Sequence, residues 1–228
     1  MENLEINSKG KRQAELKVQL NKFAHLFMIA KESYLYAEYF HNPETKDEIE
    51  LLQNDIYYYH FRFINHILFK NLVIELAKIF SRKKNDKFRI DKFLNGFKKD
   101  GQFGDLGIGI ELIQVWESEL ESNNKVIETI IKFRDELYSH TDDKEIDYDV
   151  FDINFIKIKE LLDFAEKIIC NIFSILFQTH FISNSPKFER ERFPILKILA
   201  IGEEKRKNDV YKEAIESIRR HKNNSSIE

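Results

Sequence analysis

Residues 130–143 read IIKFRDELYSHTDD, and they lie where one long helical stretch gives way to a second. Apolar residues recur at helical spacing before this segment, and the polar turn Thr141-Asp142-Asp143 follows it. Another apolar-periodic stretch comes next and predicts a helix over about residues 152–179. The segment is therefore predicted to be the end of a helix, followed by a turn, between two long helices of a bundle.

The rest of the chain also predicts helices, because only three prolines and seven glycines interrupt it. Long helices are expected over about residues 11–40, 45–81 and 106–140, the last with a break at 122–124, and a short helix over 90–97. The expected fold is all-α, a bundle of four long helices with short extra helices and a C-terminal extension. We assign residues 1–181 to the bundle and 182–228 to the extension, with a short helix at 209–221.

The helix predicted over residues 45–81 is apolar on more than one side. One face carries Leu52, Ile56, Tyr59, Phe63, Ile67, Ile74 and Phe80, while Tyr57, Phe61, Leu68 and Phe69 lie elsewhere on its circumference. A helix that is apolar on several sides is buried on several sides. It is therefore expected either at the centre of the bundle or in a dimer interface.

Composition and charge exclude several classes of protein. Apolar residues make up 43% of the chain and charged residues 33%, as in an ordered, soluble domain, and a net charge of −3 does not identify a nucleic-acid binder. A single cysteine excludes an internal disulfide and a cysteine-based zinc site. No secretory signal is visible, and the longest uncharged stretch, residues 168–186, is too polar to span a membrane. We expect a cytoplasmic protein without membrane contact.

Arg134 and His140 are the candidate catalytic residues. An arginine can bind a phosphate through its fork of donors, and a histidine can move a proton near neutral pH, which are the two tasks of RNA cleavage. Six residues along a helix correspond to a rotation of about 600° and a rise of about 9 Å, so the two side chains do not share a face of a straight helix. Either the helix ends near Ser139, or two copies of the motif meet across a two-fold axis.

An ordinary interpretation of the same residues remains open. With seven histidines and ten arginines in the chain, about one pair at this spacing is expected by chance. Arg134 could pair with Glu128 or Asp135, and His140 could cap the C-terminus of a helix, where a cation is favoured. The context of the pair, and not its spacing, has to distinguish the two interpretations.

The segment IIKFRDELYSHTDD and the long helix after it resemble the HEPN domains, and within them the AbiU2-like group associated with abortive phage infection. HEPN domains are helical bundles marked by an arginine, a polar residue directly after it and a histidine a short distance further on. The resemblance covers roughly residues 10–180 and leaves residues 182–228 unexplained.

The resemblance implies a function and a partner. HEPN proteins commonly form homodimers with two facing motifs, and many are endoribonucleases that need no metal or other cofactor. The ribose 2'-oxygen attacks the adjacent phosphate and leaves a 2',3'-cyclic phosphate and a 5'-hydroxyl. Some members do not cleave RNA, so a non-catalytic module that binds RNA or protein is the alternative. An antitoxin or another component of a defence system is also among the expected partners.

Carried onto this chain, the resemblance gives each motif residue a role. His140 is the general base or acid, Arg134 binds the scissile phosphate, and Asp135 orients Arg134. Tyr138 lies one helical turn beyond Arg134, and from this spacing we expect its hydroxyl to support the same face.

Residues 81–99 are the candidate RNA-binding segment, because they hold eight lysines and arginines against two aspartates. Arg82, Lys83, Lys84, Lys87 and Arg89 are expected to contact phosphates, and the interleaved Phe88, Phe93 and Phe97 could stack on bases. In the alternative interpretation the segment is a solvated loop whose phenylalanines anchor it to the bundle. His60 and His66 are six residues apart, which is not the spacing of a helical metal pair, and are interpreted as structural or interface histidines.

Overall fold

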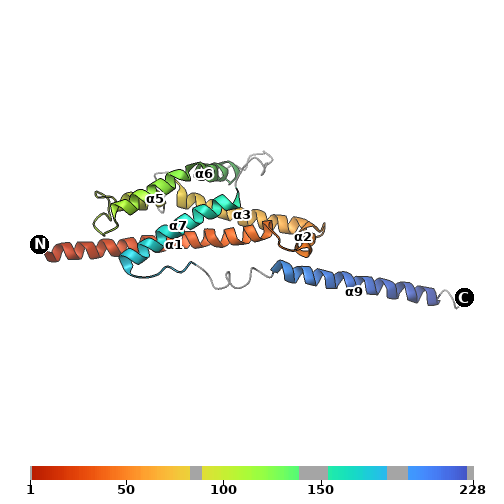
Figure 1. The fold of residues 1–228 in the computed structure, drawn as a ribbon. Coiled ribbons are helices and arrows are strands. Elements are labelled where there is room, and N and C mark those ends of the chain that lie inside the picture. Colours follow the sequence, from red (N-terminus) through yellow and green to blue (C-terminus); the bar gives the residue numbers. More distant parts are fainter. Residues whose placement is uncertain (1, 83–88, 139–153, 184–194, 225–228) are drawn as a thin grey trace. The chain divides into compact units, whose positions relative to one another are not determined.

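A computed structural model of the chain describes residues 2–82, 89–138, 154–183 and 195–224. Over these ranges the chain forms helices and no strand, so the all-α prediction is confirmed (Figure 1). The helices are α1 (Glu2–His41), α2 (Lys46–Gln53), α3 (Tyr58–Phe80), α4 (Ile90–Phe97), α5 (Ile110–Ser122), α6 (Asn124–Tyr138), α7 (Phe155–Phe177) and α9 (Ile195–Asn224). None of them is both long enough and apolar enough to cross a membrane.

The single helix predicted over residues 45–81 is wrong, because Asn54 divides it into α2 and α3. The backbone of Asn54 leaves the helical region (φ −66°, ψ 126°) and so ends α2. Its side-chain oxygen accepts the backbone N–H of Ile56 at 2.9 Å within a turn over residues 55–57, and α3 begins after that turn, at Tyr58. The capping box that starts α2 is present, since Glu48 and Thr45 each satisfy the backbone N–H of the other.

Other helix boundaries can be compared with the prediction from the sequence. The expected break at residues 122–124 separates α5 from α6, and the short helix at 90–97 is α4. The helix expected at 209–221 is instead the distal part of α9, which begins at Ile195.

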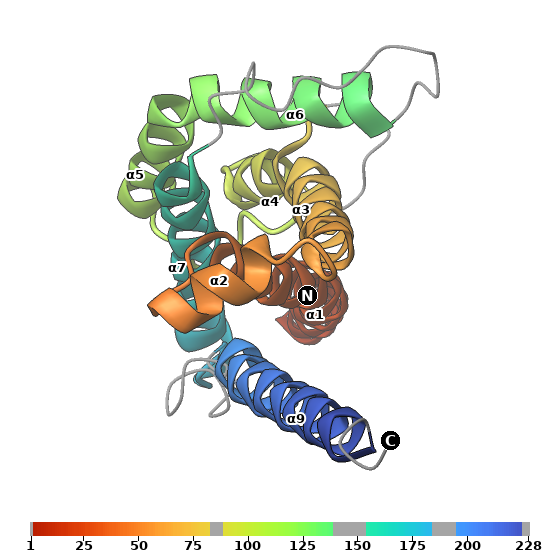
Figure 2. The same ribbon diagram turned by 90° about the vertical axis from the view of Figure 1, so that its right-hand side faces the viewer.

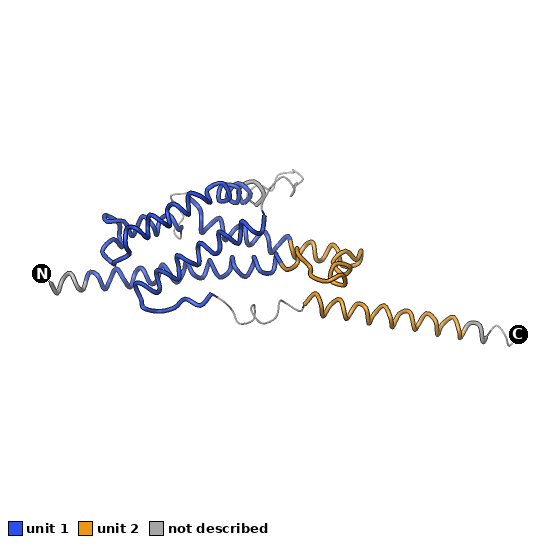
Figure 3. The backbone as a smooth tube through the Cα atoms, viewed as in Figure 1, with its two compact units in different colours: residues 1–38, 66–183 blue, residues 39–65, 184–228 orange. Residues whose placement is uncertain are grey.

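The chain divides into two compact units (Figure 3). Unit 1 comprises residues 1–38 and 66–183, and unit 2 comprises residues 39–65 and 184–228. Both units therefore combine segments that are far apart in the sequence, and each has an apolar cluster of its own.

Unit 1 is a helical bundle around one large apolar core. Both views show α1, α3 and α7 lying alongside one another, with α5 and α6 on one side of them (Figures 1 and 2). The buried side of α1 carries residues at three- and four-residue spacing, namely Leu16, Leu20, Phe23, Phe27, Ala30 and Tyr34. α7 contributes a second such row that includes Ile158, Leu161, Ala165, Ile168 and Ile172, and Trp116 of α5 is fully buried in the same core.

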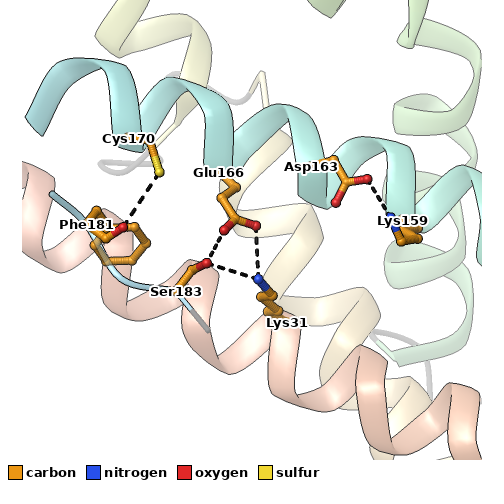
Figure 4. Close-up of polar contacts among 7 residues, drawn as sticks. All are labelled: Lys31, Lys159, Asp163, Glu166, Cys170, Phe181 and Ser183. Atoms are coloured by element: carbon orange, nitrogen blue, oxygen red, sulfur yellow. Dashed lines mark hydrogen bonds and ion pairs between the residues drawn. The ribbon is translucent and has the colours of Figure 1, made fainter. Parts of the chain in front are cut away.

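The chain after α7 is fixed to the bundle by an aromatic and a polar contact. α7 ends at Gln178, whose backbone is left-handed (φ 50°), and Phe181 then stacks on Phe173 with ring centroids 5.6 Å apart. Two residues further on, the Ser183 hydroxyl donates to Glu166. Lys31 of α1 contacts both groups, with Nζ 3.0 Å from Glu166 Oε2 and 3.0 Å from Ser183 Oγ (Figure 4).

Cys170 lies on α7 in a half-buried position, beside the chain that follows this helix. Its Sγ is 3.9 Å from the carbonyl oxygen of Phe181, and burial together with the negative charge of Glu166 raises the pKa of the thiol (Figure 4). The thiol therefore stays protonated and acts as a small packing residue.

Unit 2 has a small core formed by Tyr39, Leu51 and Leu196. The hydroxyl of Tyr39 accepts the backbone N–H of Leu196, and Tyr57 donates its hydroxyl proton to Glu203. Both hydrogen bonds are 3.0 Å long. The guanidinium of Arg206 donates two hydrogen bonds to the carboxylate of Glu203, through Nε (2.7 Å) and Nη2 (2.8 Å). These contacts join the first turns of α9 to the segment around α2 and leave a cavity of about 420 Å³ lined by apolar residues and this polar group.

We expect Phe27→Ala to lower the free energy of unfolding by about 3–5 kcal/mol, because the fully buried ring leaves a cavity that close neighbours cannot fill. Chemical denaturation followed by the fluorescence of the single, buried Trp116 measures this change. The matched control is Val18→Ala on the exposed side of the same helix, with an expected change below about 0.5 kcal/mol. Equal effects of the two substitutions would contradict the assigned core.

The stability of unit 2 should depend on pH through Glu203. The hydrogen bond from Arg206, with help from Tyr57, lowers the pKa of this carboxyl to about 2. The pKa in the folded protein lies below that of a free glutamate (about 4.3). The ionised Glu203 therefore contributes fully to the stability of unit 2 above about pH 5, and this contribution is lost as the pH falls towards 2. At neutral pH the free energy of unfolding of wild type should exceed that of Glu203→Gln by about 1 kcal/mol. The difference is small because Arg206 is half exposed and solvent screens the pair, and it should vanish near pH 2. Urea unfolding of both proteins, followed by circular dichroism between pH 7 and 2, measures it.

Candidate functional site

The position of α6 is set by one apolar row. Ile127, Ile130 and Phe133 are buried at three-residue spacing. The ring of Phe133 meets the ring of Phe69 of α3 edge to face, with centroids 5.7 Å apart and an interplanar angle of 89°. Phe69 also contacts Phe155, the first residue of α7, at 6.2 Å. The backbone that carries Arg134 is therefore held next to a three-way aromatic contact.

The structure brings Arg134 and Asp135 together. Arg134 Nε donates to Asp135 Oδ1 at 2.8 Å, and Arg134 Nη2 lies 2.7 Å from the same oxygen. The arginine side chain is 17% exposed and the aspartate side chain 40% exposed. The pair thus lies at the edge of the core, with the guanidinium on the buried side and the carboxylate on the side of the solvent.

The guanidinium keeps unused donor capacity in this arrangement. Nη2 is close to Asp135 Oδ1, but its N–H bonds are not aligned with that oxygen, and this buried atom makes no hydrogen bond within the described residues. We take the Nε bond as the hydrogen bond and the Nη2 contact as charge attraction, because a hydrogen bond requires alignment as well as distance. A buried donor without an aligned acceptor is suited to an anion such as a phosphate.

The remaining motif residues are described incompletely or not at all. Tyr138 is the last residue of α6, and nothing of its side chain is described. Ser139 and His140 lie outside the described residues, as do the Thr141-Asp142-Asp143 turn and the following residues up to 153. The described part of the candidate site therefore consists of the arginine, the aspartate and the helix that carries them.

The structure describes two of the five candidate RNA-binding residues. Arg82 follows α3, is exposed, and has Nη2 3.5 Å from a carboxylate oxygen of Glu121. Arg89 precedes α4, is mostly buried, and pairs with Asp91 over 3.2 Å. Lys83, Lys84 and Lys87 lie outside the described residues.

The aromatic residues of this segment serve the core where they are described. Phe93 and Phe97 are buried on α4, and Phe97 packs against Phe103 with centroids 5.9 Å apart. Buried rings are not available for stacking on bases, which favours the interpretation of these two phenylalanines as anchors. Phe88 lies outside the described residues.

The two histidines of α3 differ in their surroundings. His60 is exposed, whereas His66 is half buried, and burial together with the positive charge of Lys70 lowers the pKa of His66. Within the described ranges, no group of three or more His, Cys, Asp or Glu side chains is placed to hold a metal ion.

A comparison with known protein families shows in which kind of domain these residues lie. The model of the HEPN family AbiU2 matches residues 13–192, which is most of the chain. The chain belongs to the AbiU2-like HEPN family. No curated protein and no solved structure matches it. The matched range of this AbiU2-like protein contains the segment 130–143 and ends before α9 begins, so unit 2 has a large helix that the family does not account for.

The polar group of unit 2 was not predicted from the sequence. Glu203 and Arg206 are three residues apart, a spacing that is common on exposed helices and carries no signal. Tyr57, which completes the group, is 146 residues away from Glu203 in the sequence.

We expect Asp135→Asn to change the free energy of unfolding by about 1 kcal/mol or less, because the pair is adjacent in sequence and Asp135 is partly exposed. Urea denaturation measures the change. A loss several times larger would mean that the pair holds α6 in place, and any effect of the substitution on function would then have a structural cause.

Proposed function

We propose that this AbiU2-like protein is a metal-independent endoribonuclease of the HEPN type that acts in phage defence or as a toxin. The observation that carries the proposal is the arrangement of Arg134 in a chain of this family. Its guanidinium is held by Asp135 near the end of α6, and one of its buried nitrogens makes no hydrogen bond within the described residues.

The proposed reaction uses the two motif residues in different ways. His140 removes the proton from the ribose 2'-hydroxyl or supplies a proton to the leaving 5'-oxygen, a task for which histidine is the usual side chain. Arg134 binds the scissile phosphate and stabilises the charge that grows on it while the 2'-oxygen attacks. Asp135 holds the guanidinium through Nε and so directs its other donors, and Tyr138 is a supporting residue.

The proposed active form is a homodimer, the form that is common among HEPN proteins. The two motifs face each other, and the arginine and the histidine of each site come from the same subunit or from opposite subunits. Arg82, Lys83, Lys84, Lys87 and Arg89 are proposed to guide the RNA, and among the described ones Arg82 is the better placed because it is exposed.

We expect Arg134→Ala and His140→Ala each to reduce RNA cleavage by about 100-fold or more, because each removes a group that acts in the transition state. Purified wild-type protein should leave 2',3'-cyclic phosphate and 5'-hydroxyl ends, and cleavage should persist in EDTA. Gel assays of end-labelled RNA, with phosphatase and kinase treatment of the products, measure both.

The matched control is Lys125→Ala, which removes an exposed cation from the same helix and should leave cleavage unchanged. Cleavage that survives Arg134→Ala, His140→Ala and the double substitution would exclude these residues from the mechanism. If RNA is bound but never cleaved by wild type, the protein is the non-catalytic binding module. Charge reversal at Arg82, Lys83 and Lys84 should then weaken binding at low salt more than at high salt.

A further inference from the structure

Helix α3 carries two polar residues that the proposed reaction does not use. His66 and Lys70 lie one helical turn apart, and both side chains are half buried. Lysine side chains are mostly exposed, so a half-covered one has either a task for its charge or apolar neighbours for its stem. Both residues belong to unit 1, as does the whole of α6.

The contacts of α3 show in which direction Lys70 leaves the helix. Phe69 faces α6, because its ring meets the ring of Phe133. Asn71 faces α1, because its Nδ2 donates to Ser33 Oγ at 2.7 Å. Since successive residues of a helix are rotated by about 100°, Lys70 lies between the direction of α6 and the direction of α1.

The core lies on the other side of α3. Leu72 is fully buried, and the same rotation places it about 160° from Lys70 and about 120° from His66. His66 lies about 60° from Phe69, on the same side of that ring as Lys70. His66 and Lys70 therefore occupy the flank of α3 that is next to α6 and turned away from the core.

The end of α6 projects over the same flank. Figure 2 shows α6 crossing α3, with its C-terminal end on the side of α3 that is away from α7. Arg134 directly follows Phe133 and belongs to this end. Lys70 and Arg134 therefore extend from two crossing helices, each one residue beyond the ring through which its helix contacts the other.

We infer that His66 and Lys70 extend the RNA-binding site of Arg134 within one subunit. The ammonium group of Lys70 binds the phosphate next to the scissile phosphate in a single strand of RNA. His66 donates a hydrogen bond to the same nucleotide. The inference rests on the proposed function, which makes the bound strand RNA, and it adds the residues that hold this strand beside the reacting bond.

The charges on the two helices support this assignment. Burial, together with the positive charge of Lys70, lowers the pKa of His66, so the imidazole is neutral near pH 7 and still has an N–H to donate. Arg134 contributes a second cation, whose buried Nη2 makes no hydrogen bond within the described residues. Cations on neighbouring helices repel each other, and an anion bound between them stabilises both. The backbone of RNA supplies such anions at every nucleotide.

The first experiment measures RNA binding as a function of salt concentration. The full chain carries His140→Ala to prevent cleavage, and the anisotropy of a fluorescent single-stranded RNA of mixed sequence reports binding. Each phosphate that a cation neutralises contributes about 0.7 to the slope of log K against log salt. Lys70→Gln should therefore lower this slope by about 0.7 and weaken binding about tenfold at low salt, and Lys70→Arg should restore both.

Two further variants in the same background separate the contributions. His66→Leu should weaken binding with an unchanged slope, because a neutral imidazole releases no counterion. Lys125→Ala removes an exposed cation from α6 and should leave the slope and the affinity unchanged. Circular dichroism should show that all variants stay folded. If Lys70→Gln has the slope and the affinity of its parent, the inference is wrong and the lysine stem only covers Phe69.

The second experiment separates this inference from the proposed ribonuclease. In cleavage assays of the chain with an intact His140, Lys70→Gln should raise KM about tenfold and leave kcat unchanged, because Lys70 contacts a phosphate that does not react. A fall in kcat at constant KM would place Lys70 on the scissile phosphate and contradict the assignment.

The two proposals fail in different ways. Wild type that cleaves RNA, with a Lys70→Gln variant that matches it in salt slope and KM, would overturn the inference alone. Wild type that binds RNA with a slope that depends on Lys70, but never cleaves it, would contradict only the ribonuclease. Wild type that binds no RNA would overturn both.

Discussion

Phe69 touches both Phe133 and Phe155, so that α3, α6 and the start of α7 are held together at one aromatic contact. Edge-to-face aromatic pairs fix the angle between two rings as well as their distance, and they stabilise more than the burial of their area alone. Phe133 is the last buried residue of α6 whose side chain is described, and it directly precedes Arg134. The contact therefore anchors the backbone next to Arg134, although none of the three phenylalanines has any chemistry to contribute.

The sequence predicts the features of the fold that depend on local pattern. Helical spacing of apolar residues located the buried rows of α1 and α7, and Thr45 with Glu48 located the start of α2. Asn54 was missed because no proline or glycine marks the interruption, and the apolar pattern continues on both sides of it. The start of α9 was missed because residues 182–200 look irregular in the sequence. Tertiary contacts, such as that between Tyr39 and Leu196, stabilise its first turn, and the sequence does not show them.

The candidate site shows the same division between local and distant information. The proximity of Asp135 to Arg134 follows from adjacency in the sequence, and the structure gives it a definite geometry through Nε. The burial of Arg89 beside Asp91 does not follow from composition, since a run of basic residues looks alike whether its members face solvent or the core. The place of Phe63 on the outside could not be predicted either, because a helix that is apolar all round leaves open which side the rest of the protein covers.

The short turn that begins at Asn54 has a consequence for how such chains can change in evolution. Only residues 54–57 separate α2 from α3, and the side chain and the carbonyl group of Asn54 accept the N–H groups of the residues that follow. Insertion or deletion of one residue there would break these hydrogen bonds and change the direction in which α3 leaves the turn. Amino-acid replacements along α3 can be gradual, but the length of the chain between Leu51 and Tyr58 has to stay constant. Among related chains, this turn should vary in sequence and not in length.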